Sequence, residues 1–409
     1  MTSLWITLII VLLTYVGIAL GFLPGLRANR ATIALIGVGF LLLFRQISLK
    51  NIPGFLDIDT LMLLLSMMII NANLRLSGFF RLISARMLRL TRSPRVFLAI
   101  EVLFVGIMSA LFLNDTICVI FTPFLLELLL SIDRDPIPYL IALATSANIG
   151  STATITGNPQ NMIIGVASGI SYTRFFLRLA PIALLSLVFV WVIVVLLYPR
   201  EFHRQNYFAI PPTQTIRLYR PLLIKSALVV AGMLIAFLLG APVALASFLA
   251  ACVLLITRRV KPEKIFSEID WGLLVFFSGL FILTGALEQN GVSAWLMQLL
   301  HFSGKENVAS LSAVTVIMSN LVSNVPAVLL LKPLIVKMVD PVAGWLTLAA
   351  ASTLAGNLTL LGSVANLIVA ESAKQRNVTL SFWEYTRAGF LITLLSLGIS
   401  TIWLQAVVG

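Results

Sequence analysis

Three consecutive residues, Asn114, Asp115 and Thr116, place amide, carboxylate and hydroxyl oxygens inside a stretch, 109–123, that is otherwise mostly apolar. Side-chain oxygens of these kinds, together with carbonyls of unwound backbone, suit a hard cation such as sodium. In hydrocarbon each unsatisfied backbone group costs several kcal/mol, so a polar break lies within protein or lines a cavity. The sequence therefore predicts a turn at the tip of a helical hairpin.

A second polar break follows at 146–161, after a short charged loop around Arg134. It is also too polar for a helix that faces lipid, so we expect the two breaks to meet inside the protein. The candidate binding residues in it are small or polar: Gly150, Ser151, Thr152, Thr156, Gly157, Asn158 and Asn161.

The hairpin pattern recurs in the second half of the chain. Residues 108–123 align without a gap with 318–333, with five of sixteen positions identical, and Asn114 falls on Asn324. Paired interruptions at corresponding positions of two halves indicate the substrate site of a secondary transporter.

The second break recurs as well. At an offset of 205 residues, the segment 154–163 falls on 359–368 with four identities. The two halves of the chain are therefore interpreted as copies of one unit. The candidate residues of the second copy are Ser323, Asn324, Gly356, Asn357, Thr359, Gly362, Ser363 and Asn366.

Four helices are expected to start at these breaks. Asn158 and Asn324 each precede a proline by one or two residues, as an N-cap does when proline occupies the first turn. By the repeat, two more helices start at Asp115 and Ser363. Helix N-termini carry free N–H groups and partial positive charge, which suit an anion. A sodium ion is expected near Asn114, Asp115 and Asn158.

Composition defines the broad class. The chain is 59% hydrophobic and 11% charged, with a mean hydropathy of +1.04, which is typical of a polytopic membrane protein. Its basic residues border apolar segments, so the net charge of +12 indicates membrane topology and anionic lipid, and excludes a nucleic-acid partner. Cys118 and Cys252 lie in apolar runs, which argues against a disulfide or a metal cluster.

A membrane crossing takes about 20 apolar residues. The sequence predicts an all-α protein of two inverted repeats, with about ten transmembrane helices, two re-entrant hairpins and two broken helices. Five crossings per half, an odd number, would invert the second repeat relative to the first. The predicted units are a first repeat at 1–200 with a hairpin at 97–130 and a broken helix at 138–170, a linker at 201–221, and a second repeat at 222–409 with a hairpin at 307–339 and a broken helix at 345–372. The unbroken crossings are predicted at 4–22, 31–47, 60–76, 176–198, 222–239, 242–257, 271–289 and 382–408.

Charges predict the orientation. With both termini outside, 21 of the 28 Lys and Arg residues fall on the cytoplasmic side and 7 on the outer side. This bias follows the positive-inside rule, and the opposite orientation would reverse it. We therefore expect a multi-pass protein of the cell's inner (plasma) membrane, with the linker 201–221 in the cytoplasm.

The tip residues also have a purely structural interpretation. Asn114 and Asn324 could cap the hairpin arms, and Asp115 could cap its helix through the carboxylate. However, Asp115 is the only carboxylate at either tip, and acids inside a membrane are functional by default. We therefore expect Asp115 to carry a coupling cation or proton.

Other charged residues of the hairpins are expected to be structural. Glu101 and Glu127 lie nearer the hairpin base, where a short distance would bring them to the headgroups. Lys332 could neutralise an anion, but a lysine that extends along a hairpin arm to the interface is the preferred interpretation.

The motifs Asn-Asp-Thr at 114–116, Gly-Asn-Pro-Gln-Asn at 157–161, Ser-Asn-Val-Pro at 323–326 and the polar run at 356–366 resemble one superfamily of ion transporters. It includes arsenical pumps, NhaD-type sodium/proton antiporters and divalent anion/sodium symporters, and the resemblance covers essentially the whole chain. It implies a scaffold, a moving transport domain, a homodimer and an elevator-like motion. The symporters usually have Ser-Asn-Thr at both tips, so this chain is more similar to the arsenical-pump and NhaD branch.

The leading hypothesis is a secondary transporter of a small inorganic or organic anion or oxyanion-like solute, coupled to sodium or protons. Arsenite efflux and sodium/proton antiport are the alternatives. A passive channel does not need two hairpins that gate from opposite sides. An intramembrane aspartyl protease needs two adjacent carboxylates, and the tips hold one. We therefore expect no enzymatic activity and no cofactor other than a sodium ion.

Overall fold

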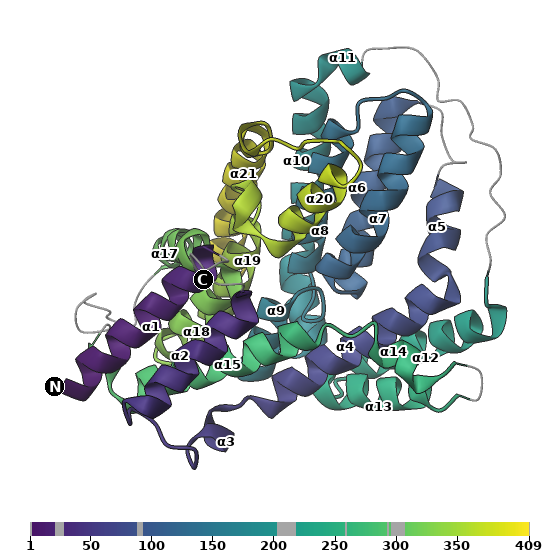
Figure 1. Ribbon diagram of the computed structural model, residues 1–409. Helices are drawn as coiled ribbons and strands as arrows, with labels where there is room; N and C mark the ends of the chain where they lie inside the picture. Colours follow the sequence, from purple (N-terminus) through teal and green to yellow (C-terminus); the bar gives the residue numbers. More distant parts are fainter. Residues whose placement is uncertain are drawn as a thin grey trace.

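The computed structural model describes residues 2–20, 28–87, 93–202, 218–257, 260–292, 294–295 and 307–408. Within these residues every regular element is a helix, as the sequence predicts (Figure 1). Seven of the helices are long and apolar enough to cross a membrane, and six shorter apolar helices accompany them. Most of the predicted linker, 203–217, lies outside the described residues.

Two helical hairpins form where the repeat predicts them. In the first, the chain turns at Phe112 and Leu113, and in the second it turns at Ser323. Ser323 has a φ of 77°, in the left-handed region that a residue with a side chain rarely adopts. Such a conformation costs about 1 to 3 kcal/mol and persists only where the surroundings impose it. The arms are α6 (Pro94–Leu111), α7 (Asn114–Ser131), α17 (Val308–Val322) and α18 (Asn324–Ile335).

Two broken helices follow the hairpins. Each second piece starts with a side-chain cap, since Asn158 Oδ1 accepts from the Asn161 amide at 2.8 Å and Ser363 Oγ accepts from the Ala365 amide at 3.2 Å. The caps satisfy N–H groups that a helix start leaves free, and so allow the helix to restart inside the protein. The pieces are α8 (Ile137–Thr152), α9 (Pro159–Ser168), α19 (Pro341–Ala355), the short helix η1 (Leu360–Gly362) and α20 (Val364–Lys374).

The helices form two layers (Figure 1). One layer, here called the hairpin layer, contains both hairpins, both broken helices, α10 (Tyr172–Leu197) and α21 (Phe382–Val408). The other layer, here called the frame layer, contains α1 (Thr2–Leu20), α2 (Arg30–Leu43), α4 (Ile58–Ser77), α12 (Arg220–Leu238), α13 (Val243–Leu255) and α15 (Trp271–Gln289). Figure 1 shows α6, α7, α8, α10, α20 and α21 in its upper part, whereas α9 and α18 lie at the height of α1 and α2. Short helices join these elements: α3 (Ile52–Phe55), α5 (Phe79–Met87), α11 (Pro199–Phe202) and α14 (Pro262–Phe266).

Each half of the chain contributes helices to both layers. In the frame layer, α2 of the first half packs on α15 of the second, and α13 of the second packs on α4 of the first. The equivalent helices α4 and α15 start with equivalent caps: Asp57 accepts from the Thr60 amide at 3.0 Å, and Asp270 accepts from the Leu273 amide at 2.9 Å. This reciprocal packing of equivalent helices is the arrangement that a pair of inverted repeats produces.

Candidate functional site

The first hairpin tip contacts the broken helix of its own half. The backbone amide of Asn114 donates to the carbonyl of Gly157 at 3.0 Å, and its side-chain Nδ2 donates to Asn148 Oδ1 at 3.1 Å. On the other side of that break, Asn158 Nδ2 donates to Ser151 Oγ at 2.8 Å. The two polar breaks of the first half therefore meet, as the sequence predicts.

The second tip also lies close to its own broken helix. A Cβ atom on Gly356 would lie 2.9 Å from Nδ2 of Asn324, closer than real Cβ contacts come. A larger residue at position 356 would therefore displace the Asn324 amide from this part of the backbone.

Asn161 closes the break in the first half. Its Nδ2 donates to the carbonyls of Ser151 at 3.0 Å and Thr154 at 2.9 Å, the last residues before the chain turns. These carbonyls have no intrahelical donor because the helix ends there, and a buried carbonyl without a donor is unfavourable. The side chain of Asn161 therefore stabilises the interruption.

Asn366 does the same in the second half. Its Nδ2 donates to the carbonyls of Gly356 at 2.7 Å and Thr359 at 3.1 Å. Donor and acceptors all lie 205 residues after their counterparts in the first half, which is the offset that aligns the two sequences. The repeat therefore extends to individual hydrogen bonds.

Asn148 joins the two halves at the centre of the hairpin layer. Its Oδ1 accepts from Asn114 Nδ2 at 3.1 Å and from Ser363 Oγ at 3.0 Å, and its Nδ2 donates to Asn357 Oδ1 at 2.9 Å and Asn366 Oδ1 at 3.0 Å. A side-chain amide has two donors and two acceptor positions, and all four are used here. The side chain is 2% exposed, so this network is shielded from water.

Thr353 takes the equivalent position in the second half and makes the reciprocal contact. Its Oγ1 accepts from Asn158 Nδ2 at 3.2 Å and from Gln160 Nε2 at 3.2 Å. Asn148 of the first half bonds to Ser363 of the second half. Thr353 of the second half bonds to Asn158 of the first half, and Asn158 is the counterpart of Ser363. The contacts are reciprocal, as expected about a pseudo-two-fold axis.

Sequence reasoning missed three members of this network: Asn148, Thr353 and Gln160. A signal for two of them was present, because Asn148 lies within the polar break at 146–161 and the offset of 205 places it on Thr353. What the sequence does not reveal is that these side chains cross from one half to the other.

The other predicted residues lie around this network. Ser151 and Thr152 both donate to the Asn148 carbonyl, at 2.7 and 3.3 Å. Asn357 Nδ2 donates to the Thr145 carbonyl at 3.3 Å. The buried or closely packed remainder comprises Gly150, Thr156, Gly157, Thr359 and Gly362.

Asp115 and Thr116 instead face the frame layer. Thr116 Oγ1 accepts from Asn71 Nδ2 of α4 at 3.3 Å. Asp115, half-buried in the first turn of α7, interacts electrostatically with Arg30 at the start of α2 and with Asp270 at the start of α15. The charge at the tip therefore lies where the two layers meet.

The tips are not capped as the sequence predicts. Leu113 and Ser323 occupy the cap positions of α7 and α18, and neither makes a side-chain cap bond, so Asn114, Asp115 and Asn324 lie within their helices. The structural alternative for Asp115, a cap of α7, is therefore wrong, and its role in coupling stays a prediction. The Oδ1 atoms of Asn114 and Asn324 are both buried and have no hydrogen-bond partner among the described residues.

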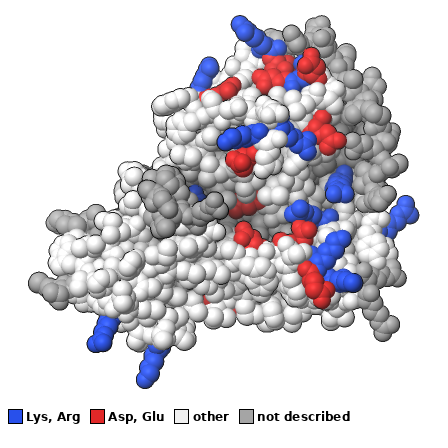
Figure 2. Space-filling view, in the orientation of Figure 1, with Lys and Arg blue, Asp and Glu red and all other residues white. Residues whose placement is uncertain are grey.

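Two further expectations concern charged side chains. Glu101 is 1% exposed, so its predicted place among the headgroups is wrong, whereas Glu127 is exposed. Lys332 lies with its Nζ 3.9 Å from a carboxylate oxygen of Asp57, across the boundary between the layers. Figure 2 shows acidic and basic side chains along the hollow between the upper and lower parts of the molecule.

The chain is all-helical and has several membrane-spanning helices, and its two repeated halves each bring a hairpin and a broken helix to one buried polar network. These features define a membrane transporter. Residues 9–355 match the model of a family described as "Citrate transporter", and the chain belongs to this family. This agrees with the resemblance to ion transporters. The chain is a transporter and not an enzyme.

Named relatives are similar over most of their length. The chain is 30% identical to the silicon efflux transporter LSI3 of Oryza sativa subsp. japonica, over 91% of each chain. It is 27% identical to a transporter named arsB of Dictyostelium discoideum, over 90% of this chain and 86% of that one. A crystal structure of the Alcanivorax borkumensis YdaH transporter superposes with a TM-score of 0.63 at 16% identity, covering 100% of this chain and 98% of that one, which shows the shared fold.

Proposed function

We propose that this protein is a secondary active transporter of a small oxyanion or oxyacid, coupled to sodium or protons. The observation that carries the proposal is the buried network in which Asn148 joins both hairpin-bearing halves. A polar network at the interface of inverted repeats is where secondary transporters bind their solute.

The residues favour a small, hydroxylated solute. The side chains of the network are neutral amides and hydroxyls, which both donate and accept hydrogen bonds. The N-termini of α7, α9, α18 and α20 lie beside it and stabilise negative charge. An oxyanion, or its protonated oxyacid, matches both properties.

Sodium coupling is supported by the unpartnered oxygens at the tips. Asn114 Oδ1 and Asn324 Oδ1 occupy equivalent positions of the two halves, and Asp115 adds a carboxylate beside the first. Asn158 Oδ1 is already engaged by the Asn161 amide. A sodium ion near Asn114, Asp115 and Asn158 would therefore use oxygens of the first two residues.

The two layers suggest how access alternates. The hairpin layer holds the network and would move as one body against the frame layer, with contacts such as Lys332–Asp57 and Thr116–Asn71 broken and remade. An elevator motion of this kind needs a fixed frame, which a homodimer would provide. Light scattering of the purified protein tests the dimer, and a monomer in detergent and in nanodiscs would contradict it.

Efflux of a metalloid oxyacid is the second candidate, because relatives are named for silicon efflux and as arsB. The oxyacids of silicon and arsenic are small hydroxylated molecules of the kind that the network favours. Direction is set by the coupling gradient, so the same site serves export or import.

Reconstituted protein tests the proposal. Proteoliposomes receive silicic acid, arsenite, sulfate or citrate, each with an imposed sodium gradient, an imposed pH gradient or neither. We expect protein-dependent accumulation of one solute above equilibrium with one gradient only. Movement that stops at equal concentrations under every gradient would show a passive channel and overturn the proposal, as would the absence of any protein-dependent flux.

Orientation is proposed from the charge bias and has its own test. With Cys252 replaced by serine and the buried Cys118 kept, one cysteine is added at either Leu49 or Gln375, which are both exposed. In intact cells an impermeant thiol reagent should label the Leu49 variant and spare the Gln375 variant until the membrane is permeabilised. The reverse pattern would place both termini in the cytoplasm.

A further inference from the structure

Glu101 is a buried acid that the proposed site does not use. It lies on the first arm of the first hairpin, α6, and is 1% exposed. Neither of its carboxylate oxygens has a hydrogen-bond partner within the described part of the chain. An ionised carboxylate without a partner is strongly unfavourable in an apolar interior, so in this arrangement the group holds a proton.

The helix α8, which packs on α6, holds a second buried polar group without a partner among the described residues. Near one end of the interface, the Phe97 and Tyr139 rings lie 5.7 Å apart. Near the other end, Gly150 packs tightly on Gly106, because a Cβ atom on Gly150 would lie 2.1 Å from the Gly106 carbonyl oxygen. Glu101 lies between these two contacts on α6.

Ser146 lies between the same two contacts on α8. It is fully buried, and its hydroxyl has no hydrogen-bond partner in the described residues. Glu101 and Ser146 are therefore two unpartnered polar groups on helices that pack on each other, with no hydrogen bond between them.

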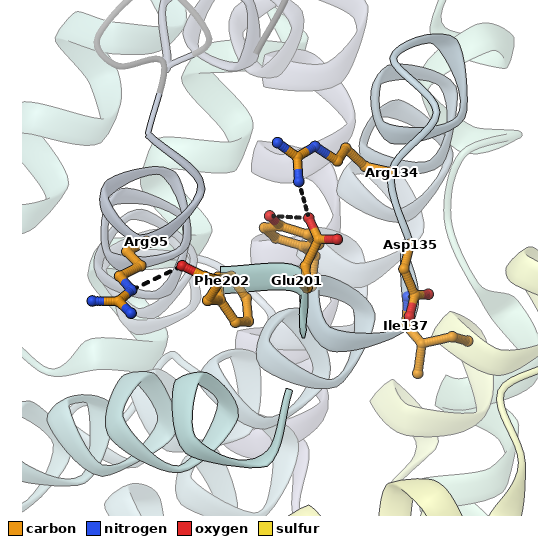
Figure 3. A network of polar contacts seen from close by, with 7 residues as sticks. Arg95, Arg134, Asp135, Ile137, Glu201 and Phe202 are labelled. Carbon is orange, nitrogen blue, oxygen red and sulfur yellow. Dashed lines mark hydrogen bonds and ion pairs between the residues drawn. The ribbon is translucent and has the colours of Figure 1, made fainter. Parts of the chain in front are cut away.

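A chain of polar groups leads from Glu101 to the loop between α7 and α8. Tyr139 interacts electrostatically with Glu101, and its hydroxyl donates to Glu201 Oε1 at 3.2 Å. Glu201 Oε1 also lies 3.3 Å from Arg134 Nη1 (Figure 3). Phenol, carboxylate and guanidinium groups therefore lie between the buried acid and the surface of the membrane.

The other elements packed on α6 bring few titratable groups. Besides Tyr139, α8 offers none, and α11 offers Glu201 with the neighbouring Arg200. On α7, Asp115 lies at the tip beside the frame layer, Cys118 is buried and Glu127 is exposed. The charged residues of α10 are Arg174 and Arg178 in its first two turns, whereas Trp191, near its other end, contacts α6 through the Arg95 carbonyl at 3.0 Å.

We propose that Glu101 is a proton-binding site of the transport cycle, which takes up one proton in the state described here and releases it to water when its surroundings open. The inference rests on the proposed function and adds a proton as a ligand of the hairpin layer. The carboxylate accepts the proton, and no other bond changes. The proton arrives from the end of the α6–α8 interface at which Tyr139 lies.

Infrared spectroscopy of the reconstituted wild-type protein tests proton binding without any solute. We expect the C=O stretch of a protonated carboxyl group to persist at a pH at which exposed acids are ionised. The Glu101→Gln variant should lack this band, and Glu127→Gln, which changes the exposed acid of the same hairpin, should keep it. A wild-type spectrum without the band would overturn the inference, whatever the variants do.

Transport then tests the role of the proton. A gradient of about one pH unit coupled to one proton supports about tenfold accumulation. With silicic acid as the probe, Glu101→Gln should lose this accumulation and its pH dependence but retain exchange at equal concentrations, while Glu101→Asp should retain accumulation with a shifted pH profile. Accumulation by Glu101→Gln equal to that of the wild type would refute the inference alone, whereas a wild type that moves none of the four solutes would refute the proposed function.

Discussion

Asn148→Ala is expected to abolish transport and to destabilise the protein by about 3 kcal/mol or more, since a buried hydrogen-bonding group left without its partner costs about 1 to 3 kcal/mol. The substitution removes one side chain but releases four groups, on Asn114, Ser363, Asn357 and Asn366. Their costs are not additive, because neighbouring groups can rearrange. Thermal unfolding in detergent and solute uptake into proteoliposomes measure the two effects.

The repeat supplies matched controls. Asn148→Thr installs the residue that the second half has at position 353, and Thr353→Asn makes the reciprocal change. Threonine can accept from Asn114 or Ser363 but cannot replace both donated bonds, so Asn148→Thr should be intermediate. Thr353→Ala leaves two donors, on Asn158 and Gln160, and should destabilise less than Asn148→Ala. Equal losses of stability and transport in Asn148→Ala and Thr353→Ala would contradict a central role for Asn148 in the network.

Most of the fold could be predicted from the sequence because a membrane crossing has a strong local signal. The helices predicted at 271–289 and 382–408 have those bounds in the structure, since length and hydropathy alone define them. The hairpins and broken helices could be predicted because polar residues inside apolar runs must lie within the protein or line a cavity.

The contacts within the site could not be predicted in the same way. Asn148 lies in a predicted break, but its four partners come from two halves of the chain, and only the folded structure brings α8 beside α20. The caps of α7 and α18 were misplaced by one or two residues because hairpin geometry, and not side-chain preference, determines where these helices start.

Glu101 was misassigned for a different reason. Distance from the hairpin base suggested a headgroup contact, whereas the helical period gives the better indication. Glu101 lies four residues after Phe97 and four before Val105, which are both fully buried, so all three share the inward face of α6. Periodicity within an apolar helix therefore locates a buried acid better than its depth does.

Asp115→Asn is expected to keep the fold and to abolish solute accumulation driven by a cation gradient. Asp115 makes no cap bond that the substitution could remove, and asparagine has nearly the same shape, so the change removes only the charge. The Asp115 carboxylate lies at the boundary of the layers and interacts with Arg30 and Asp270. There it would neutralise the charge of a cation bound at the tip. Moving one charge through the membrane potential is worth about 2.3 kcal/mol per 100 mV, which is enough to drive about a 50-fold solute gradient.

The measurement is uptake into proteoliposomes with sodium outside and an imposed membrane potential, compared with exchange at equal solute concentrations. Asp115→Asn should lose the dependence on sodium and voltage while exchange continues, and Asp133→Asn, which changes an exposed acid in the loop after α7, should behave like the wild type. If Glu101 carries the proton, Asp115→Asn should also leave the pH profile of exchange unchanged, so the two acids are separable. A folded Asp115→Asn protein that still concentrates solute with unchanged sodium dependence would show that the tip carboxylate serves only the contact between the layers.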